Sequence, residues 1–357
     1  MSGTVRQTGK RLDSRSKEIL EAVVRLHSET GRPVSSGLVA RFLPVAPSPA
    51  TIRAVMKRLE QTGHLEQPHT SAGRLPTDAG YRVYVDGLRA AWSLRRFDVP
   101  SEMLAAARQA TPSTGGQGRI KDLARLLSLL TRNISIVAGP SLDAVSVVRL
   151  ESYPRTPDKV MMVLILDNGR VQTRLVDLDA DYPPAVVARA AGILSERFGG
   201  RLVGDLRGNR RPMVDLVRTP VSRCAAVLAR EGVGMLEDLE ESEVEMDGVA
   251  RMLEEPEFQD AEPLKALIRF LESPRDIRTS LDRMYHRDRE PFGVWIGAEN
   301  PLRSLRNFSV VTSEIKLDGG LGLLAVLGPR RLPYQRTFQG MEILRRFSSD
   351  RPGSQVN

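Results

Sequence analysis

The residues whose types and spacing could do chemistry in this chain lie on one predicted helix near position 50. Ser48 can accept hydrogen bonds from the free amides of a helix start, and Pro49 suits the first helical position because it has no N–H to lose. Apolar residues recur at helical spacing over 52–59, which predicts one buried face, and Gly63 ends the helix. The opposite face of this helix is therefore predicted to be exposed and able to bind a partner.

That opposite face carries side chains that recognise duplex DNA. Thr51 and Arg53 lie in the first turn, the part of a recognition helix that enters the major groove, and arginine is the usual bidentate reader of guanine. Lys57 and Arg58 lie further along and are expected to hold phosphates, which adds affinity but little sequence preference. For Arg58, a salt bridge with a neighbouring acid is the main alternative.

A ribbon is predicted after this helix. Leu65 to His69 reads as a strand, and the small residues 71–73 supply a tight turn that leaves Arg74 at the tip, within reach of a phosphate or a narrow minor groove. His69 could donate to a phosphate, although a packing or capping role is an equal alternative. The candidate DNA-binding residues are Ser48, Thr51, Arg53, Lys57, Arg58, His69, Thr70, Ser71 and Arg74.

The elements that must position these residues can be predicted from local signals. A first helix is expected over 14–30, ended by Gly31 and Pro33, and a second helix begins after Ser35. Thr77 is expected to cap a further helix whose apolar edge packs on this domain or on a partner subunit. Helix, short helix, turn, longer helix and ribbon is the order of a winged helix-turn-helix.

The distribution of charge supports DNA as the partner. The net charge of the 357-residue chain is +8, and residues 1–98 hold 16 Lys and Arg against 9 Asp and Glu. The other 259 residues hold 36 against 35, so nearly all the excess positive charge lies beside the predicted recognition helix. The length allows two or three domains, and the composition is ordinary for a soluble protein.

No catalytic, metal or cofactor site can be drawn from the sequence, so we expect a protein that is not an enzyme. The 4 histidines lack ligand spacing, no nucleophile–base pair is visible, and the glycines of 318–322 precede a strand rather than a helix. Seven acids over 237–247 have no histidine or cysteine nearby and favour a solvated helix face.

The expected location is the cytoplasm, in association with the nucleoid. Cys224 is the only cysteine, which excludes an intramolecular disulfide and indicates a reducing compartment. We expect Cys224 to be a small buried hydrophobe. The sequence has no secretory leader and no apolar run long enough to cross a bilayer, so no membrane partner is expected.

The remainder of the chain is predicted to be mixed α/β. A Gly/Ser/Thr-rich connector within 98–118 leads into an amphipathic helix that starts near Ile120. Strands are predicted at 145–150, 159–166, 171–178, 292–296, 309–316 and 321–327, with helices at 184–197 and 336–347. Asp167-Asn168-Gly169 is a strong hairpin signal. The interval 205–288 has a helical pattern, and its apolar stripe over 264–271 needs a partner.

The string QPHTSAGRLPTDAGYRVYVD, with SPATIR before it, closely resembles the HrcA family of heat-inducible transcription repressors. The segments SLLTRNISIVAGP, PEFQD and IGAENP resemble the family as well. The resemblance implies a bacterial repressor that binds an inverted-repeat operator upstream of chaperone genes as a homodimer and is kept active by the GroE chaperonin. The chain departs from the family at Ala54-Val55, where an Asn-Asp pair is expected after SPATIR.

The expected fold is an α+β multidomain arrangement in which a winged helix-turn-helix precedes a GAF-like sheet domain that carries a mostly helical inserted dimerisation domain. The resemblance supplies the last two assignments. The predicted boundaries are a disordered leader at 1–12, a winged-helix domain at 13–97, a linker at 98–118, a GAF-like domain at 119–204 and 289–348, an insertion at 205–288 and a tail at 349–357.

Two rival functions remain open at this point. In the first, the GAF-like domain senses a small metabolite that releases DNA, and a largely apolar pocket with a few polar groups would favour it. In the second, the chain binds DNA without sequence preference and serves as a scaffold. That protein would show a steep salt dependence and equal affinity for scrambled duplexes.

Overall fold

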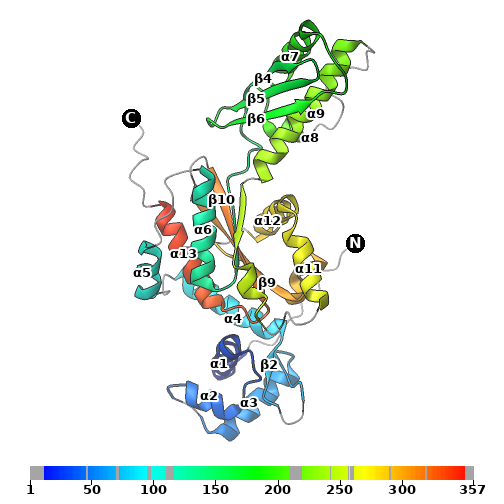
Figure 1. Cartoon of the computed structure of the whole chain (residues 1–357). Helices are drawn as coiled ribbons and strands as arrows, with labels where there is room; N and C mark the ends of the chain where they lie inside the picture. The colour runs from blue at the N-terminus through cyan, green and yellow to red at the C-terminus, as the bar shows by residue number, and fades with distance from the viewer. Residues whose placement is uncertain are drawn as a thin grey trace.

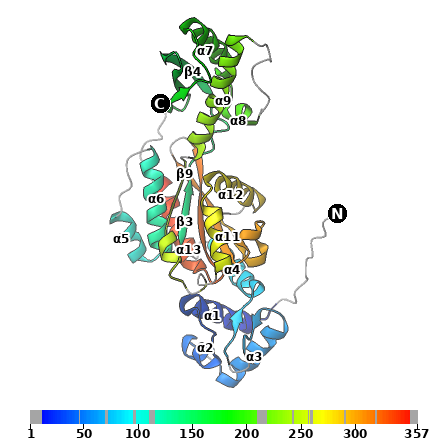
Figure 2. The ribbon, with the colours of Figure 1, turned by 45° about the vertical axis from the view of Figure 1, so that its right-hand side comes forward.

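The structure of the chain, a computed structural model, describes residues 12–349 apart from 46, 70–71, 95–97, 110–115, 209–218, 242, 256, 258–260, 289–290 and 318–319. Three tiers follow one another along an elongated molecule (Figures 1 and 2). An N-terminal module, residues 13–93, lies at one end. A central sheet domain lies in the middle, and a smaller inserted unit, residues 142–241, lies at the far end from the module.

The N-terminal module is built from four helices and a short ribbon. Its elements are α1 (Ser14–Thr30), α2 (Ser36–Phe42), α3 (Pro49–Gln61), β1 (Leu65–Glu66), β2 (Leu75–Pro76) and α4 (Asp78–Ser93). The expected helix at 14–30 is confirmed, and so are the predicted caps. The side chains of Ser35, Ser48 and Thr77 each accept a hydrogen bond from a backbone amide three residues later.

The central domain is a five-stranded antiparallel sheet of order β7-β3-β10-β9-β8. Its strands are β3 (Ile134–Ala138), β7 (Val244–Asp247), β8 (Gly293–Ile296), β9 (Phe308–Leu317) and β10 (Gly320–Pro329). Alternate residues of β9 and β10 enter two separate cores: Val311 and Leu324 face one, and Val310 and Leu323 face the other. The sheet is therefore buried on both faces.

Helices cover both faces of this sheet. One face packs against α6 (Gly116–Thr131) and α13 (Tyr334–Ser349), with α5 (Ser101–Gln109) against those two helices. The other packs against α11 (Ala261–Leu271) and α12 (Pro274–Asp288), beside the short helices α10 (Val249–Met252), η2 (Gly297–Glu299) and η3 (Arg303–Leu305). The apolar stripe over 264–271 thus finds its partner in the central domain, because Leu267 and Leu271 lie in that core.

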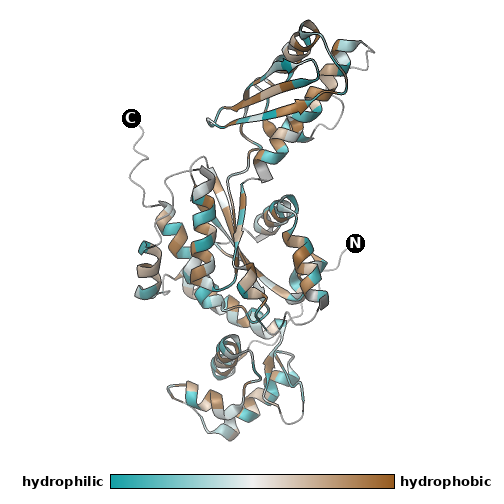
Figure 3. Ribbon diagram, viewed as in Figure 1, coloured by the Kyte–Doolittle hydropathy of each residue, from teal (hydrophilic) through white to brown (hydrophobic). Residues whose placement is uncertain are grey.

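The inserted unit has its own sheet and its own core. The strands β4 (Val147–Thr156), β5 (Lys159–Leu166) and β6 (Val171–Asp177) form an antiparallel sheet that packs against α7 (Pro184–Phe198) and α9 (Pro220–Glu241), with α8 (Val203–Gly208) beside α9. The hairpin predicted at 167–169 is confirmed, since β5 pairs with β6 and Gly169 adopts φ +83°. Figure 3 shows hydrophobic residues, coloured brown, along these strands.

The predicted boundaries of the insertion were wrong. The sequence assigned 145–178 to the GAF-like sheet and 205–288 to the insertion, but strands β4–β6 pair only with one another, while β7, α11 and α12 return to the central domain. Both units are mixtures of helices and strands with similar local patterns. Which strand pairs with which is decided by long-range packing, and no local signal records it.

Among the described residues, no helix is both long enough and apolar enough to cross a bilayer.

Candidate nucleic-acid interface

Helix α3 lies in the module at the end of the molecule opposite the inserted unit (Figure 1). Ile52, Met56 and Leu59 are buried in the core of the module, as the helical spacing predicted. The other face of α3 is exposed to solvent. Because its inner face is fixed by apolar packing, the helix presents that outer face in one orientation.

Two cations of this face have no partner among the described residues. Arg53 and Lys57 are exposed, and within the described part of the chain neither side chain has a hydrogen bond or ion pair. A cation without an internal partner loses no interaction when it approaches a phosphate or a base edge. These two side chains are therefore available to an external anion.

Ser48 and Thr51 are exposed, but they already interact with each other. Ser48 accepts a hydrogen bond from the backbone N–H of Thr51 at 3.2 Å, and the two hydroxyl oxygens lie 2.9 Å apart. Ser48 is thus the N-cap that was predicted. Ala54, where an asparagine was expected from the resemblance, is also exposed on this helix.

Arg58 is paired inside the protein. Its guanidinium donates to Asp13 at 2.5 Å and also to the Ser16 hydroxyl, so the salt bridge considered as the alternative is present. Hydrogen bonds from Ser16, and then the Arg58 guanidinium, hold the pKa of Asp13 below its usual value. The pair links α3 to the start of α1 and is half exposed, so it is open to exchange with a phosphate.

The ribbon is shorter than predicted, and Arg74 does not lie at its tip. β1 spans two residues rather than reaching His69, and the chain turns where the Ala72 N–H donates to the His69 carbonyl at 2.9 Å. Arg74 lies at the base, where its backbone exchanges two hydrogen bonds with Val34 and its Nε donates to Glu60 at 3.0 Å. The misplacement arises because this Val34 pairing is long-range and has no local signal.

Of the other three ribbon candidates, the described part of the chain includes only His69. His69 is exposed at the turn. Thr70 and Ser71 fall outside the described residues. Gly73 lies against the Val34 backbone so closely that an added Cβ would meet the Val34 oxygen at 2.4 Å, which explains why a glycine is needed there.

A cleft of about 370 Å³ separates α3 from the base of the ribbon. Arg53 lines it from α3, Ser35 and Ser36 from the start of α2, and Gln67 from the segment after β1. Ser35 was predicted only as a helix cap, and no role was predicted for Ser36 or Gln67. No spacing signal could have found them, since three separate segments form the cleft.

On its other side the module is joined to the central domain by charged groups of α4. Arg82 is ion-paired with Glu299, with its Nε 3.0 Å from a carboxylate oxygen, and also donates to the Val294 carbonyl at 2.7 Å. Asp78, at the start of α4, accepts from the Ala298 N–H at 3.0 Å. These bonds connect α4 to strand β8 and to the η2 turn that follows it.

Aromatic groups fill the same junction. Trp92 of α4 packs edge-on against Phe292 with ring centroids 4.8 Å apart, and Phe292 stacks on Phe338 of α13 at 4.5 Å. His27 of α1 is hydrogen-bonded through Nδ1 to the Tyr81 hydroxyl at 2.6 Å. Burial lowers the pKa of His27 to about 4, so the imidazole is neutral near pH 7.

The acidic run at 237–247 serves ion pairs at the base of the inserted unit. Glu243 is buried and pairs with Arg170 at 2.5 Å, and Glu237 pairs with Arg275 at 3.3 Å. In the described part of the chain, no group of three or more His, Cys, Asp or Glu side chains could hold a metal ion. Cys224 is buried, and that burial raises the pKa of its thiol to about 11.

The known proteins that this chain is similar to in sequence are members of one family. Residues 117–338 match the family model described as the HrcA protein C terminal domain. The "Heat-inducible transcription repressor HrcA" of Desulfitobacterium hafniense is 31% identical over 344 residues, covering 94% of this chain and 96% of that protein. The repressor of the same name from Symbiobacterium thermophilum is 31% identical over 338 residues, covering 91% and 94%.

One solved structure shares the fold along the whole length. It is described as a hypothetical protein at 2.2 Å resolution, and it is similar with a TM-score of 0.60 and 22% identity over 95% of this chain and 98% of that chain. The three-tier arrangement therefore has an experimental counterpart.

Proposed function

The chain belongs to the HrcA family of heat-inducible transcription repressors, and from this premise we propose that it binds an inverted-repeat operator of heat-shock chaperone genes as a homodimer. Because the relatives are named as repressors, the expectation of a regulator rather than an enzyme is confirmed. DNA binding, the operator, the dimer and the chaperonin are the parts that we propose.

The proposal depends on Arg53 and Lys57, which are exposed on α3 and have no partner in the part of the chain that the structure describes. The order of α1, α2, α3 and the β1–β2 ribbon fits a winged helix-turn-helix, in which the third helix enters the major groove. In this arrangement Arg53 reads a base edge and Lys57 holds a phosphate. Thr51 lies beside Arg53 in the first turn.

The other predicted residues take secondary roles. Ser48 fixes the start of α3 as its cap, and Arg74 holds the base of the ribbon against Glu60. Arg58 reaches a phosphate by exchanging its partner Asp13. His69 lies at the turn of the ribbon, and we expect it, together with Thr70 and Ser71 that follow it in the sequence, to contact the DNA backbone of the neighbouring groove.

The homodimer is supported by an open face of the sheet in the inserted unit. Alternate residues of β5 and β6 that point away from the core include Val163 and Ile165, which are partly exposed, and Val171 and Leu175, which are 59% and 55% exposed. Tyr153 of β4 lies opposite Met161 of β5 in the sheet, next to these residues, and is 50% exposed. A contiguous apolar face of this kind indicates a protein interface, and a second copy matches a two-fold operator.

The central five-stranded sheet with helices on both faces supports a GAF-like assignment for the middle tier. Regulation by the GroE chaperonin is proposed from the family resemblance. An apolar sheet face that is exposed until the dimer forms is a feature that a chaperonin binds.

The proposal is tested by a mobility shift at physiological salt with an inverted-repeat chaperone operator and a scrambled duplex of equal length and composition. Selective binding of the operator by a dimer, with the dimer measured by analytical ultracentrifugation, is the expected result. Equal binding of both duplexes over a range of salt would support the nonspecific scaffold instead. Adding GroE should raise the fraction of protein active in operator binding without changing its affinity.

A further inference from the structure

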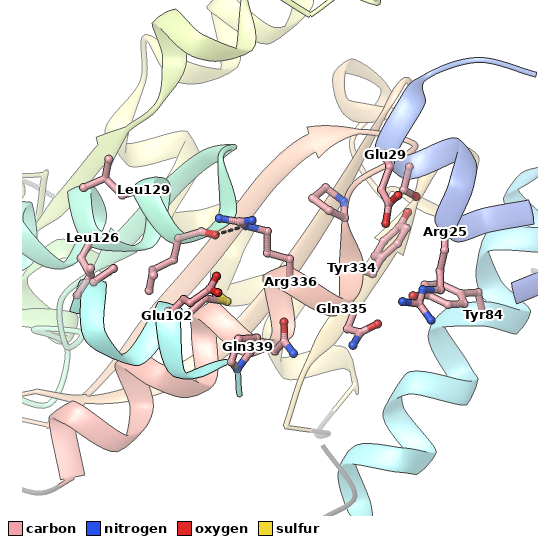
Figure 4. Close-up of a pocket in the computed structure, with 16 residues that line it drawn as sticks. Arg25, Glu29, Tyr84, Glu102, Leu126, Leu129, Tyr334, Gln335, Arg336 and Gln339 are labelled. Carbon is pink, nitrogen blue, oxygen red and sulfur yellow. Dashed lines mark hydrogen bonds between the residues drawn. The ribbon is translucent and has the colours of Figure 1, made fainter. Parts of the chain in front are cut away.

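A cavity of about 520 Å³ lies at the junction between the N-terminal module and the central domain. Figure 4 shows its walls: α1 and α4 of the module on one side, and α5, α6 and α13 of the central domain on the other. The volume falls in the range of small-molecule sites, roughly 300–1,000 Å³. The proposed contacts with DNA do not involve this cavity.

One end of the cavity is apolar. Met103 of α5 and Leu126 and Leu130 of α6 are buried side chains of this wall, and Leu129 lies at its edge with 50% of its surface exposed. An exposed leucine beside a cavity lined by buried apolar groups offers a surface for the hydrocarbon part of a ligand.

Arg336 of α13 brings positive charge to this apolar wall. Its Nε donates to the Leu130 carbonyl at 2.6 Å, the dashed bond of Figure 4, and no carboxylate in the described part of the chain pairs with it. Burial and the nearby charge of Arg132 lower the pKa of Arg336 from its usual value. Glu102 also lines the cavity, but the structure places no ion pair between it and Arg336.

Arg132 itself is in an unusual backbone conformation. It follows the C-terminus of α6 with φ +58°, the left-handed region in which a glycine would be less strained. Two arginines are therefore near each other at this place, Arg336 partly buried in the cavity wall and Arg132 exposed outside it, with no acid paired to either among the described residues. An anion would neutralise this charge.

The module contributes an unsatisfied polar atom to the same cavity. The hydroxyl oxygen of Ser28 in α1 is buried and has no hydrogen-bond partner within the described structure. Buried hydroxyls are usually hydrogen-bonded, so this one is available to a polar group of a bound molecule.

We propose that this cavity binds a small amphipathic monoanion, with its acidic head on Arg336 and its apolar body against Leu126, Leu129 and Met103. A medium-chain or aromatic carboxylic acid has this chemistry. The ligand contacts both the module and the central domain, and it therefore biases the orientation in which α3 is presented to DNA. This effect on DNA rests on the proposed function, whereas binding of the anion does not.

The test uses the full chain without DNA and two matched probes. Isothermal titration with decanoate, below its micelle concentration, is compared with decan-1-ol, which has the same apolar body but no charge. We expect decanoate to bind with one site per chain and decan-1-ol to bind about tenfold more weakly, the effect of one charge-assisted hydrogen bond. Equal binding of the two probes would overturn the charge assignment.

Two substitutions on one helix locate the site. Ala106 is an exposed residue of α5 that lines the cavity, whereas Ala105 is an exposed residue of the same helix that does not. Ala106→Trp should fill the cavity and weaken decanoate binding by about tenfold or more, and Ala105→Trp should leave it unchanged. An equal effect of the two variants, or no effect of either, would show that decanoate binds elsewhere and refute the site.

The charge is tested separately. Arg336→Gln should reduce decanoate binding about tenfold while leaving decan-1-ol binding unchanged, a difference that a merely destabilised fold would not produce. Arg346→Gln, on the same helix but outside the cavity, is the control. Saturating decanoate should then shift operator affinity for the wild type and not for Ala106→Trp. Binding of decanoate without any change in operator affinity would refute the coupling alone.

Discussion

The outer face of α3 and the junction behind α4 use the same kinds of side chain in opposite ways. On α3, Arg53 and Lys57 are exposed and have no partner among the described residues. At the junction, Arg82 is bonded to Glu299 and to a backbone carbonyl, and His27 is bonded to Tyr81. Both regions belong to one module of fewer than a hundred residues, and both contribute to its positive charge.

The two regions differ in whether their cations are already bonded inside the protein, and this decides which arginine is available for binding DNA. Positive charge alone does not distinguish the two regions, because a paired arginine must lose an internal bond before it can contact DNA. We therefore expect substitutions at the junction to lower stability and substitutions on α3 to lower DNA recognition.

The largest effect is expected at His27, through pH. The folded pKa of about 4 lies below the usual 6.5, so between these values the unfolded chain binds a proton that the folded chain does not. Stability therefore falls as pH drops from about 6.5 to about 4, by roughly 2–3 kcal/mol. Chemical denaturation followed by tryptophan fluorescence should show this loss, since Trp92 lies at the junction.

The control for this prediction is a second histidine. His27→Gln should flatten the dependence of stability on pH over this window, whereas His69→Gln, at the exposed turn, should retain it. Acidic groups also titrate in this range, so the part of the pH dependence of stability that both variants retain is due to those groups. If the unfolding free energy of His27→Gln depended on pH as steeply as that of the wild type, His27 would not contribute to this pH dependence.

On α3 we expect Arg53→Ala to remove about 1–3 kcal/mol of discrimination between the operator and a scrambled duplex. The unfolding free energy should not change, because the side chain has no internal partner. Mobility shifts with both duplexes measure the first quantity and denaturation measures the second. Arg108→Ala, an exposed arginine of α5, is the control, and unchanged discrimination in Arg53→Ala would remove Arg53 from direct readout.

At the junction, Arg82→Gln should lower the unfolding free energy by about 1–2 kcal/mol, since it removes the cation paired with Glu299 and the donor to the Val294 carbonyl. Operator discrimination by the folded protein should remain. Lys57→Gln is the comparison, with unchanged stability and a smaller dependence of affinity on salt. Loss of discrimination in Arg82→Gln with full stability would contradict the division between the two regions.

The smallest effect is expected for Arg58, which lies between the two classes. It is on α3, but it pairs with Asp13 in a half-exposed salt bridge. Arg58→Gln should change stability by less than about 1 kcal/mol and weaken binding to the operator and the scrambled duplex equally. Denaturation and paired mobility shifts measure both, and a change in preference between the duplexes would assign Arg58 to base readout.

Several elements of the module and one turn of the inserted unit were determined by local sequence. The start of α3 at Ser48 and Pro49, the start of α4 after Thr77 and the turn at Gly169 all depend on residues within about four positions of one another. Their hydrogen bonds are short-range, so the residue types alone specify them. The apolar repeat of α3 likewise fixed which face is buried and which face is outward.

Tertiary structure decided which of the outward cations are available and how the sheets divide. Arg58 meets Asp13 across 45 positions, Arg82 meets Glu299 across 217, and Arg74 is held by a pairing with Val34. The insertion was misplaced for the same reason, because β3 pairs with β7 and β10, which lie beyond the whole inserted unit in the sequence. The sequence determined the faces of the elements, and long-range packing determined what each face contacts.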